Sequence, residues 1–151
     1  TKLANPHKQV VGIIGDGAFL MSHTELFTAS NLNIGAIFTI FNDGELAQIS
    51  QAQSVPYNKK TCTLLPNLRL KAMVEASGCH YLKIETNNDI QAVIAQAIDL
   101  SEEGIPVVLD VNIDYSKKTR FTQGIIATNL KRMKLPTKVR MVSRALWRRV
   151  K

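Results

Sequence analysis

The sequence predicts an α/β fold, a three-layer α/β/α sandwich built on a parallel sheet. Short apolar, β-branched runs alternate with segments of helical periodicity, and hydrophobic residues make up 45% of the 151 residues against 21% charged. A chain of this length and composition buries roughly 70% of its unfolded surface in one compact domain. Strands that alternate with helices form a parallel sheet covered on both faces, and right-handed crossovers connect them.

The first two strands are expected to form a β-α-β unit. Residues Val10–Ile14 are typical of a strand buried on both faces, and a second such run spans Gly35–Phe41. Ser22 and Glu25 have the spacing of a capping box, so we expect the intervening helix to begin there. This capping role would give the Glu25 carboxylate a structural function, so no catalytic role is assigned to it.

The remaining elements continue the same alternation. Glycine and proline mark the boundaries between these elements: Gly104 is expected to end a helix, and Pro106 precedes the last strand. The expected elements are a helix at Asn67–Ser77, a strand at His80–Ile84, a helix at Asp89–Glu102 and a strand at Val107–Val111.

The positive charge of the chain is concentrated at its C-terminal end. Residues 1–116 contain 7 Lys or Arg and 12 Asp or Glu, whereas residues 117–151 contain 12 basic residues and no acidic one. We therefore expect a body at 1–116 and a basic tail at 117–151, in which Lys138–Lys151 forms an amphipathic helix. Packing of its apolar face on protein is preferred, with nucleic-acid or membrane contact left as alternatives. Lys59-Lys60 is expected to be a solvated loop pair.

Several classes of protein are excluded or disfavoured. No run approaches the roughly 18 apolar residues of a membrane span, and the first residues lack a signal-peptide core, so a cytoplasmic location is expected. Cys62 and Cys79 have no paired Cys or His cluster nearby in the sequence that would complete a metal site, so they are expected to be reduced, structural thiols. Thr1–Pro6 resembles the last turn of a helix and its exit, and four strands are few for such a sheet. We therefore expect a piece of a longer polypeptide.

Two acidic turns follow the first two strands. In an open parallel sheet, ligands bind beyond the carboxyl ends of the strands, so Asp16 and Asp43 should point into one crevice. At a separation of about 4 Å and an effective dielectric near 20, their repulsion is on the order of 4 kcal/mol, which a bound Mg²⁺ would relieve. Gly15 and Gly17 would let a bulky anion approach, and the amides of Gly17 and Ala18 would bind it. Because these turns lie outside the core, replacement of either aspartate should leave the fold intact.

The pattern resembles the thiamine diphosphate-dependent enzymes, and within them the acetolactate synthase (acetohydroxyacid synthase) large-subunit group. A Gly-Asp-Gly about two dozen residues before an Asn-Asn or Asn-Asp pair is the cofactor signature of this family. The resemblance covers residues 1 to about 115, the family's C-terminal pyrophosphate-binding domain. It is carried by Leu3–Pro6, Val10–Met21, Glu25–Ala29 and Phe41–Gly44.

The resemblance implies a role for each matching residue. Asp16, Asp43 and the backbone carbonyl of Glu45 would be the Mg²⁺ ligands, and Gly15, Gly17 and Ala18 would lie at the diphosphate. Leu46, Gln48 and Ile49 would lie along thiamine diphosphate and the reaction centre. Gln48 departs from the apolar residue common in the family, and Ala52 stands where branched-chain synthases often have Trp. Both departures leave the choice of 2-keto acid open.

The implied activity is decarboxylation of pyruvate and transfer of the two-carbon unit to a second 2-keto acid. The catalytic glutamate of this family lies on a pyrimidine-binding domain that is absent here, so the fragment alone should be inactive. A homodimer or homotetramer, a regulatory subunit and FAD as a further cofactor are compatible with the resemblance. The alternatives are a pyruvate oxidase, a 2-keto acid decarboxylase, a glyoxylate carboligase, or a non-catalytic nucleic-acid-binding module that uses the basic tail.

Overall fold

The structure is a computed structural model that describes residues 1–57, 59–113 and 131–150. The end of the predicted body at residue 116 and the first part of the basic tail lie outside the described residues. The chain divides into two compact units. The first unit is Thr1–Gly44 with Asn67–Ile113, and the second is Glu45–Pro66 with Asp114–Lys151.

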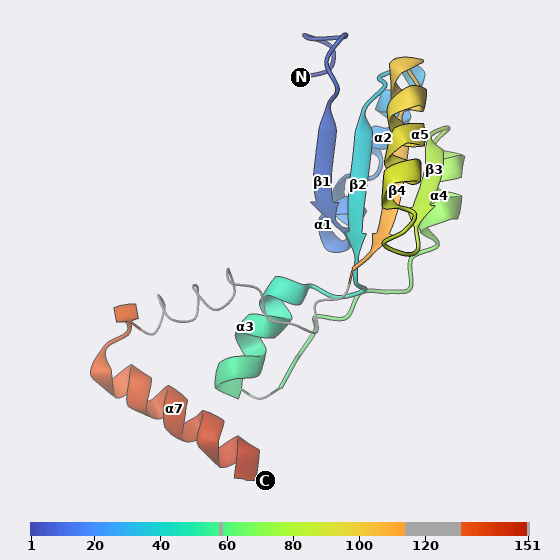
Figure 1. The fold of residues 1–151 in the computed structure, drawn as a ribbon. Helices are drawn as coiled ribbons and strands as arrows, with labels where there is room; N and C mark the ends of the chain where they lie inside the picture. Colours follow the sequence, from blue (N-terminus) through green and yellow to red (C-terminus); the bar gives the residue numbers. More distant parts are fainter. Residues whose placement is uncertain (58, 114–130, 151) are drawn as a thin grey trace. The chain divides into compact units, whose positions relative to one another are not determined.

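The first unit is built on a four-stranded parallel sheet (Figure 1). The strand order is β1-β2-β4-β3, so each consecutive strand is reached through a helical crossover. The strand predicted at His80–Ile84 is confirmed at its exact bounds, and the other three lie within two residues of their predicted ends. The strands are β1 (Val11–Gly15), β2 (Ile37–Asn42), β3 (His80–Ile84) and β4 (Val107–Asn112).

Helices lie on both faces of this sheet, which confirms the three-layer prediction. In Figure 1, α5 (Ile90–Glu102) lies on one face, and α1 (Asp16–Ser22), α2 (Glu25–Asn31) and α4 (Leu70–Ala76) lie on the other. Two separate apolar clusters fill the two interfaces. On the α5 face the buried residues are Ile37, Ala97, Val107 and Leu109, and on the opposite face they are Phe19, Leu26, Ile40, Leu70, Val74, Cys79 and Val108.

The prediction that the first strand is buried on both faces is wrong. Val11 is 55% exposed and Ile13 is 71% exposed, while the intervening Gly12 and Ile14 are partly buried. The reason is that α5 packs mainly on β2, β3 and β4, so the face of the edge strand β1 that carries Val11 and Ile13 is left largely uncovered. An apolar run alone does not distinguish an edge strand from a central one.

The predicted capping box at Ser22–Glu25 is also wrong. The helix between β1 and β2 is split in two, and Thr24, at the N-cap of α2, makes no side-chain hydrogen bond to the helix. Thr24 already has helical dihedral angles, with φ −60° and ψ −24°, whereas a capping residue is extended. Ser22 instead donates its hydroxyl to the Ala18 carbonyl at 3.2 Å, and the Glu25 carboxylate accepts from the Thr28 hydroxyl at 3.3 Å.

Close backbone packing beside α5 requires glycine at one position. A Cβ added at Gly35 would overlap the backbone carbonyl of Ser101, in the last turn of α5. The helix ends at Glu102, and Gly104 follows two residues later with a φ of +85°, in the left-handed region that glycine tolerates. The predicted stop at Gly104 is therefore confirmed. The close approach of Gly35 to the Ser101 carbonyl was not predicted from the sequence.

Both cysteines are free thiols, as predicted. Cys79 lies in the core against α2, where its thiol is 3.5 Å from the Leu26 carbonyl, and burial raises its pKa. Cys62 is exposed and has a positive φ of 56°, so the prediction of a structural role is wrong for this cysteine.

Helices α3 and α7 belong to the second unit. The first, α3 (Ala47–Tyr57), was not predicted; the second, α7 (Leu135–Val150), confirms the amphipathic helix and begins three residues earlier than expected. The packing predicted for the apolar stripe of α7 stays a prediction, since Leu135, Val139, Val142 and Leu146 are between 47% and 73% exposed. In the part of the chain that is described, every helix is too short or too polar to cross a membrane.

Candidate functional site

The carboxyl ends of β1 and β2 lie side by side. The two strands pair in parallel register, with Gly15 opposite Phe41 at the last pair. The chain then enters α1 directly at Asp16, whereas β2 continues through Asn42 into a loop. The sequence prediction that both acidic turns meet at one edge of the sheet therefore describes the geometry of the first unit.

The Asp16 carboxylate organises this edge. Asp16 is only 3% exposed, so the prediction that this residue lies outside the core is wrong. One oxygen, Oδ1, accepts the Gly17 amide at 2.7 Å, and the other, Oδ2, accepts the amides of Asp43 and Gly44 at 3.2 Å and 2.7 Å. The carboxylate thus ties the loop after β2 to the start of α1 through backbone groups far apart in sequence.

These hydrogen bonds change the argument for a metal ion. Backbone N–H groups already compensate the burial of the Asp16 charge, so the carboxylate does not require a cation for its own stability. A carboxylate has about four lone-pair directions, and three are in use here. One direction on Oδ1 is left for a divalent ion, so the donor chemistry of Asp16 fits Mg²⁺.

Glycines leave open space at the same edge. A Cβ built on Gly15 or on Gly44 would meet no atom within 4 Å. Gly44 also has a φ of +69°, which a residue with a side chain rarely adopts. Room for a bulky anion therefore exists beside the Asp16 carboxylate. Of the two amides predicted to bind that anion, Gly17 is engaged with Asp16 and Ala18 is exposed in the first turn of α1.

A buried polar network supports the loop after β2 from the neighbouring strand. Asp110 on β4 is 6% exposed and accepts the Asn42 side-chain amide at 3.2 Å and the Tyr81 hydroxyl at 2.7 Å. Burial, followed by the hydrogen bond to Asp110, raises the pKa of Tyr81. Sequence reasoning missed this network, although a single aspartate within the apolar run of β4 was the available signal, because a buried charge needs partners.

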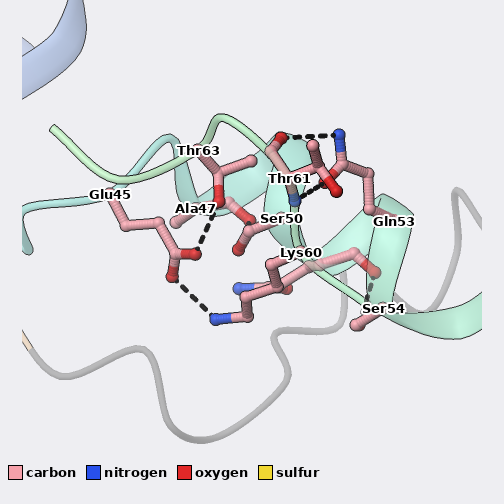
Figure 2. Close-up of polar contacts among 9 residues, drawn as sticks. Glu45, Ala47, Ser50, Gln53, Ser54, Lys60, Thr61 and Thr63 are labelled. Carbon is pink, nitrogen blue, oxygen red and sulfur yellow. Dashed lines mark hydrogen bonds and ion pairs between the residues drawn. The ribbon is translucent and has the colours of Figure 1, made fainter. Parts of the chain in front are cut away.

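In the second unit, the Glu45 side chain is held by the segment that follows α3. Its Oε2 pairs with Lys60 Nζ at 2.8 Å, and its Oε1 accepts the Thr63 hydroxyl at 3.0 Å (Figure 2). The Glu45 side chain is 15% exposed, and the hydrogen bond from Lys60 lowers its pKa. Lys60 is an exposed loop charge, as predicted, but its ammonium also has a specific carboxylate partner that the sequence did not reveal.

The structure does not place all predicted site residues in one unit. Gly15, Asp16, Gly17, Ala18 and Asp43 belong to the first unit. Glu45 and Leu46 lie just before α3 in the second, with the exposed Gln48 and Ile49 in its first turn. Within the described parts of the chain, no three His, Cys, Asp or Glu side chains gather as a metal cluster. The metal and cofactor roles of these residues stay predictions.

Comparisons with known proteins match the larger part of the chain. The family described as "Thiamine pyrophosphate enzyme, C-terminal TPP binding domain" matches residues 1–111. The chain is 32% identical over 114 residues to the acetolactate synthase of Bacillus subtilis, and 34% identical over 119 residues to a probable acetolactate synthase large subunit of Methanococcus aeolicus. Each match covers 76% of this chain but only 20% and 19% of the relative. The chain therefore spans about a fifth of the length of these curated relatives.

A solved structure shows the same fold. The thiamine diphosphate-dependent 4-hydroxybenzoylformate decarboxylase of Rhodococcus jostii RHA1 is similar with a TM-score of 0.68 at 24% identity. The likeness covers 76% of this chain and 22% of that one.

Proposed function

This chain belongs to the thiamine pyrophosphate enzymes as their C-terminal TPP binding domain, and on this premise we propose that it is the cofactor-binding part of an acetolactate synthase-like enzyme. The complete enzyme would decarboxylate pyruvate and join the two-carbon unit to a second 2-keto acid. Support comes from the acetolactate synthases among its relatives and from the edge of the sheet at which Asp16 meets the backbone of Asp43 and Gly44. That edge is the single observation on which the proposal depends.

The proposed site uses this chain's residues to bind and orient the cofactor. Asp16 and Asp43 would hold Mg²⁺ through their carboxylates, and the backbone carbonyl of Glu45, which follows Gly44 in the chain, would be the third protein ligand. Oxygen ligands of this kind, with phosphate oxygens and water in the other positions, suit the octahedral preference of Mg²⁺. When bound, thiamine diphosphate supplies the electron sink for decarboxylation, while the protein supplies orientation and electrostatics.

The residues around this site have separable tasks. Gly15 and Gly44 would leave the space in which the diphosphate is accommodated. Gly17 and Ala18 would donate their amides to it, which requires the Gly17 amide to be shared with Asp16 or released from it. Leu46, Gln48 and Ile49 would lie along the cofactor. The activating glutamate would come from a pyrimidine-binding domain, in another part of the enzyme or a second subunit.

The proposal is tested with the complete enzyme that contains this chain. We expect release of carbon dioxide from pyruvate with formation of acetolactate, strictly dependent on thiamine diphosphate and Mg²⁺. Asp43→Ala should abolish this turnover, whereas Lys59→Ala, a nearby change at an exposed residue of the second unit, should not. Oxygen consumption with a reduced flavin would indicate an oxidase instead, and aldehyde as the main product would indicate a decarboxylase. Full activity without thiamine diphosphate would refute the proposal.

A further inference from the structure

The loop that leads into α3 passes through Gly44, a residue that gives the backbone before Glu45 more conformational freedom than any other would. Gly44, which precedes Glu45, has a positive φ of 69° and open space around its Cα. Glycine populates both halves of φ space, so sterics at Gly44 do not fix the direction of the next peptide. The Gly44 amide holds the N-terminal side of the loop by donating to Asp16 at 2.7 Å, and the orientation of the Glu45 peptide beyond it depends on contacts on its C-terminal side.

Those contacts come from the segment that returns after α3. Thr63 contacts both Glu45 and its neighbour: its hydroxyl donates to Glu45 Oε1 at 3.0 Å, and its backbone carbonyl accepts the Leu46 amide at 2.8 Å. An antiparallel bridge between Glu45 and Leu64 continues the same pairing. Thr63 is 2% exposed, so its hydrogen bonds are formed away from solvent. The Glu45 carbonyl itself accepts the Ala47 amide at 2.8 Å, which leaves its second lone pair for another partner. The Glu45 backbone is thus held by side-chain and main-chain contacts together.

The same segment is fastened at two further points. Lys60 Nζ forms an ion pair with the other carboxylate oxygen of Glu45, Oε2, at 2.8 Å. The side-chain amide of Gln53 on α3 makes two hydrogen bonds to the backbone of Thr61, accepting its N–H at 2.8 Å and donating to its carbonyl at 3.3 Å. Figure 2 shows these contacts converging on the returning segment from Glu45 and from α3. Release of Lys60 should therefore loosen the Thr63 contacts as well.

We propose that Lys60 and Thr63 are positioning residues for the cofactor site, because they hold the Glu45 side chain and the Leu46 amide and so fix the loop whose Glu45 carbonyl the proposed function assigns to Mg²⁺. We call Glu45, Lys60 and Thr63 the Glu45 clasp. This inference rests on the proposed function, because the clasp has this role only if the Glu45 carbonyl is a Mg²⁺ ligand. Neither Lys60 nor Thr63 needs to touch the cofactor.

The test compares Lys60→Met with Lys59→Met. Both substitutions remove a positive charge and keep most of the side-chain length at adjacent positions, but only Lys60 pairs with Glu45 among the described contacts. Hydrogen exchange of the Leu46 amide, measured without cofactor, should accelerate in Lys60→Met and in Thr63→Val and stay at the wild-type rate in Lys59→Met. Lys60→Arg should restore protection, since it keeps a cationic donor for Glu45.

The second readout is Mg²⁺ affinity of the complete enzyme at a fixed, saturating concentration of thiamine diphosphate. Lys60 is half exposed, so Lys60→Met should weaken Mg²⁺ binding by only about two- to fivefold. Thr63→Val should weaken it by a similar or larger factor because the lost hydrogen bond is buried. Excess Mg²⁺ should recover the loss in both variants, as expected for a positioning role. In Glu45→Gln, the further substitution Lys60→Met should have little additional effect.

The two levels of the proposal fail in different ways. Absence of Mg²⁺-dependent cofactor binding in the wild-type enzyme would refute the proposed function, while Leu46 exchange would still report on the clasp. Wild-type binding together with unchanged Mg²⁺ affinity in both Lys60→Met and Thr63→Val would overturn the positioning role alone. Equal losses in Lys59→Met and Lys60→Met would also overturn it, because a general charge effect would then explain the result.

Discussion

Removal of the Asp16 carboxylate should separate a structural role from a metal-binding role. Asp16→Ala deletes the acceptor for three backbone amides, those of Gly17, Asp43 and Gly44. At about 1 kcal/mol of net stability for each hydrogen bond, the expected destabilisation is about 3 kcal/mol. Asp16→Asn keeps one carbonyl oxygen, which can serve the two amides after β2. It should therefore destabilise by about 1 kcal/mol, through the lost bond to Gly17 and the lost charge at the start of α1.

Urea denaturation followed by circular dichroism measures these differences. Glu25→Ala is the matched control, because it removes an exposed carboxylate nearby and should change stability by no more than about 0.5 kcal/mol. Both Asp16 variants should nevertheless lose Mg²⁺-dependent cofactor binding in the complete enzyme. The reasoning is refuted if Asp16→Ala is as stable as the control, or if Asp16→Asn is destabilised as strongly as Asp16→Ala.

Three further outcomes follow from the burial or exposure of single residues. Tyr81→Phe removes the hydroxyl that donates to the buried Asp110 carboxylate and should cost about 1–3 kcal/mol in urea denaturation; an unchanged midpoint would contradict the network. Cys62 should react with a thiol reagent in the folded protein, whereas Cys79, with its burial and raised pKa, should react only after unfolding; equal rates would refute this assignment. Gly35→Ala places a Cβ on a backbone carbonyl and should destabilise by about 3 kcal/mol or prevent folding, and a stable variant would show that the loop can yield.

Local sequence signals predicted the elements of the sheet well, and their failures have identifiable causes. Strand β3 and helix α5 were found because apolar periodicity and the glycine stop act within the element itself. The exposed face of β1 was missed because burial depends on the neighbours of a strand, which its own residues do not encode. Helix α3 was missed because its weakly amphipathic sequence carries little helical periodicity.

The candidate site was predicted from the two acidic turns, but not the contacts that support them. Strand order and parallel register brought Asp16 to the loop after β2, and this followed from the general geometry of parallel sheets. Three amide donors on one carboxylate could not be foreseen, since their positions depend on backbone dihedral angles in the turn. The partners of Asp110 and of Glu45 were missed for a related reason, because long-range side-chain pairs leave no spacing pattern in one sequence.

Binding of a divalent ion between the two strand ends is the central claim, and Mn²⁺ used as a paramagnetic substitute for Mg²⁺ tests it most directly. Titration of the complete enzyme with Mn²⁺ in the presence of thiamine diphosphate, followed by electron paramagnetic resonance, reports the number and affinity of bound ions. We predict one ion for each copy of this chain, and loss of that ion in both Asp16→Asn and Asp43→Asn. Undiminished binding of the ion in either variant would contradict the account.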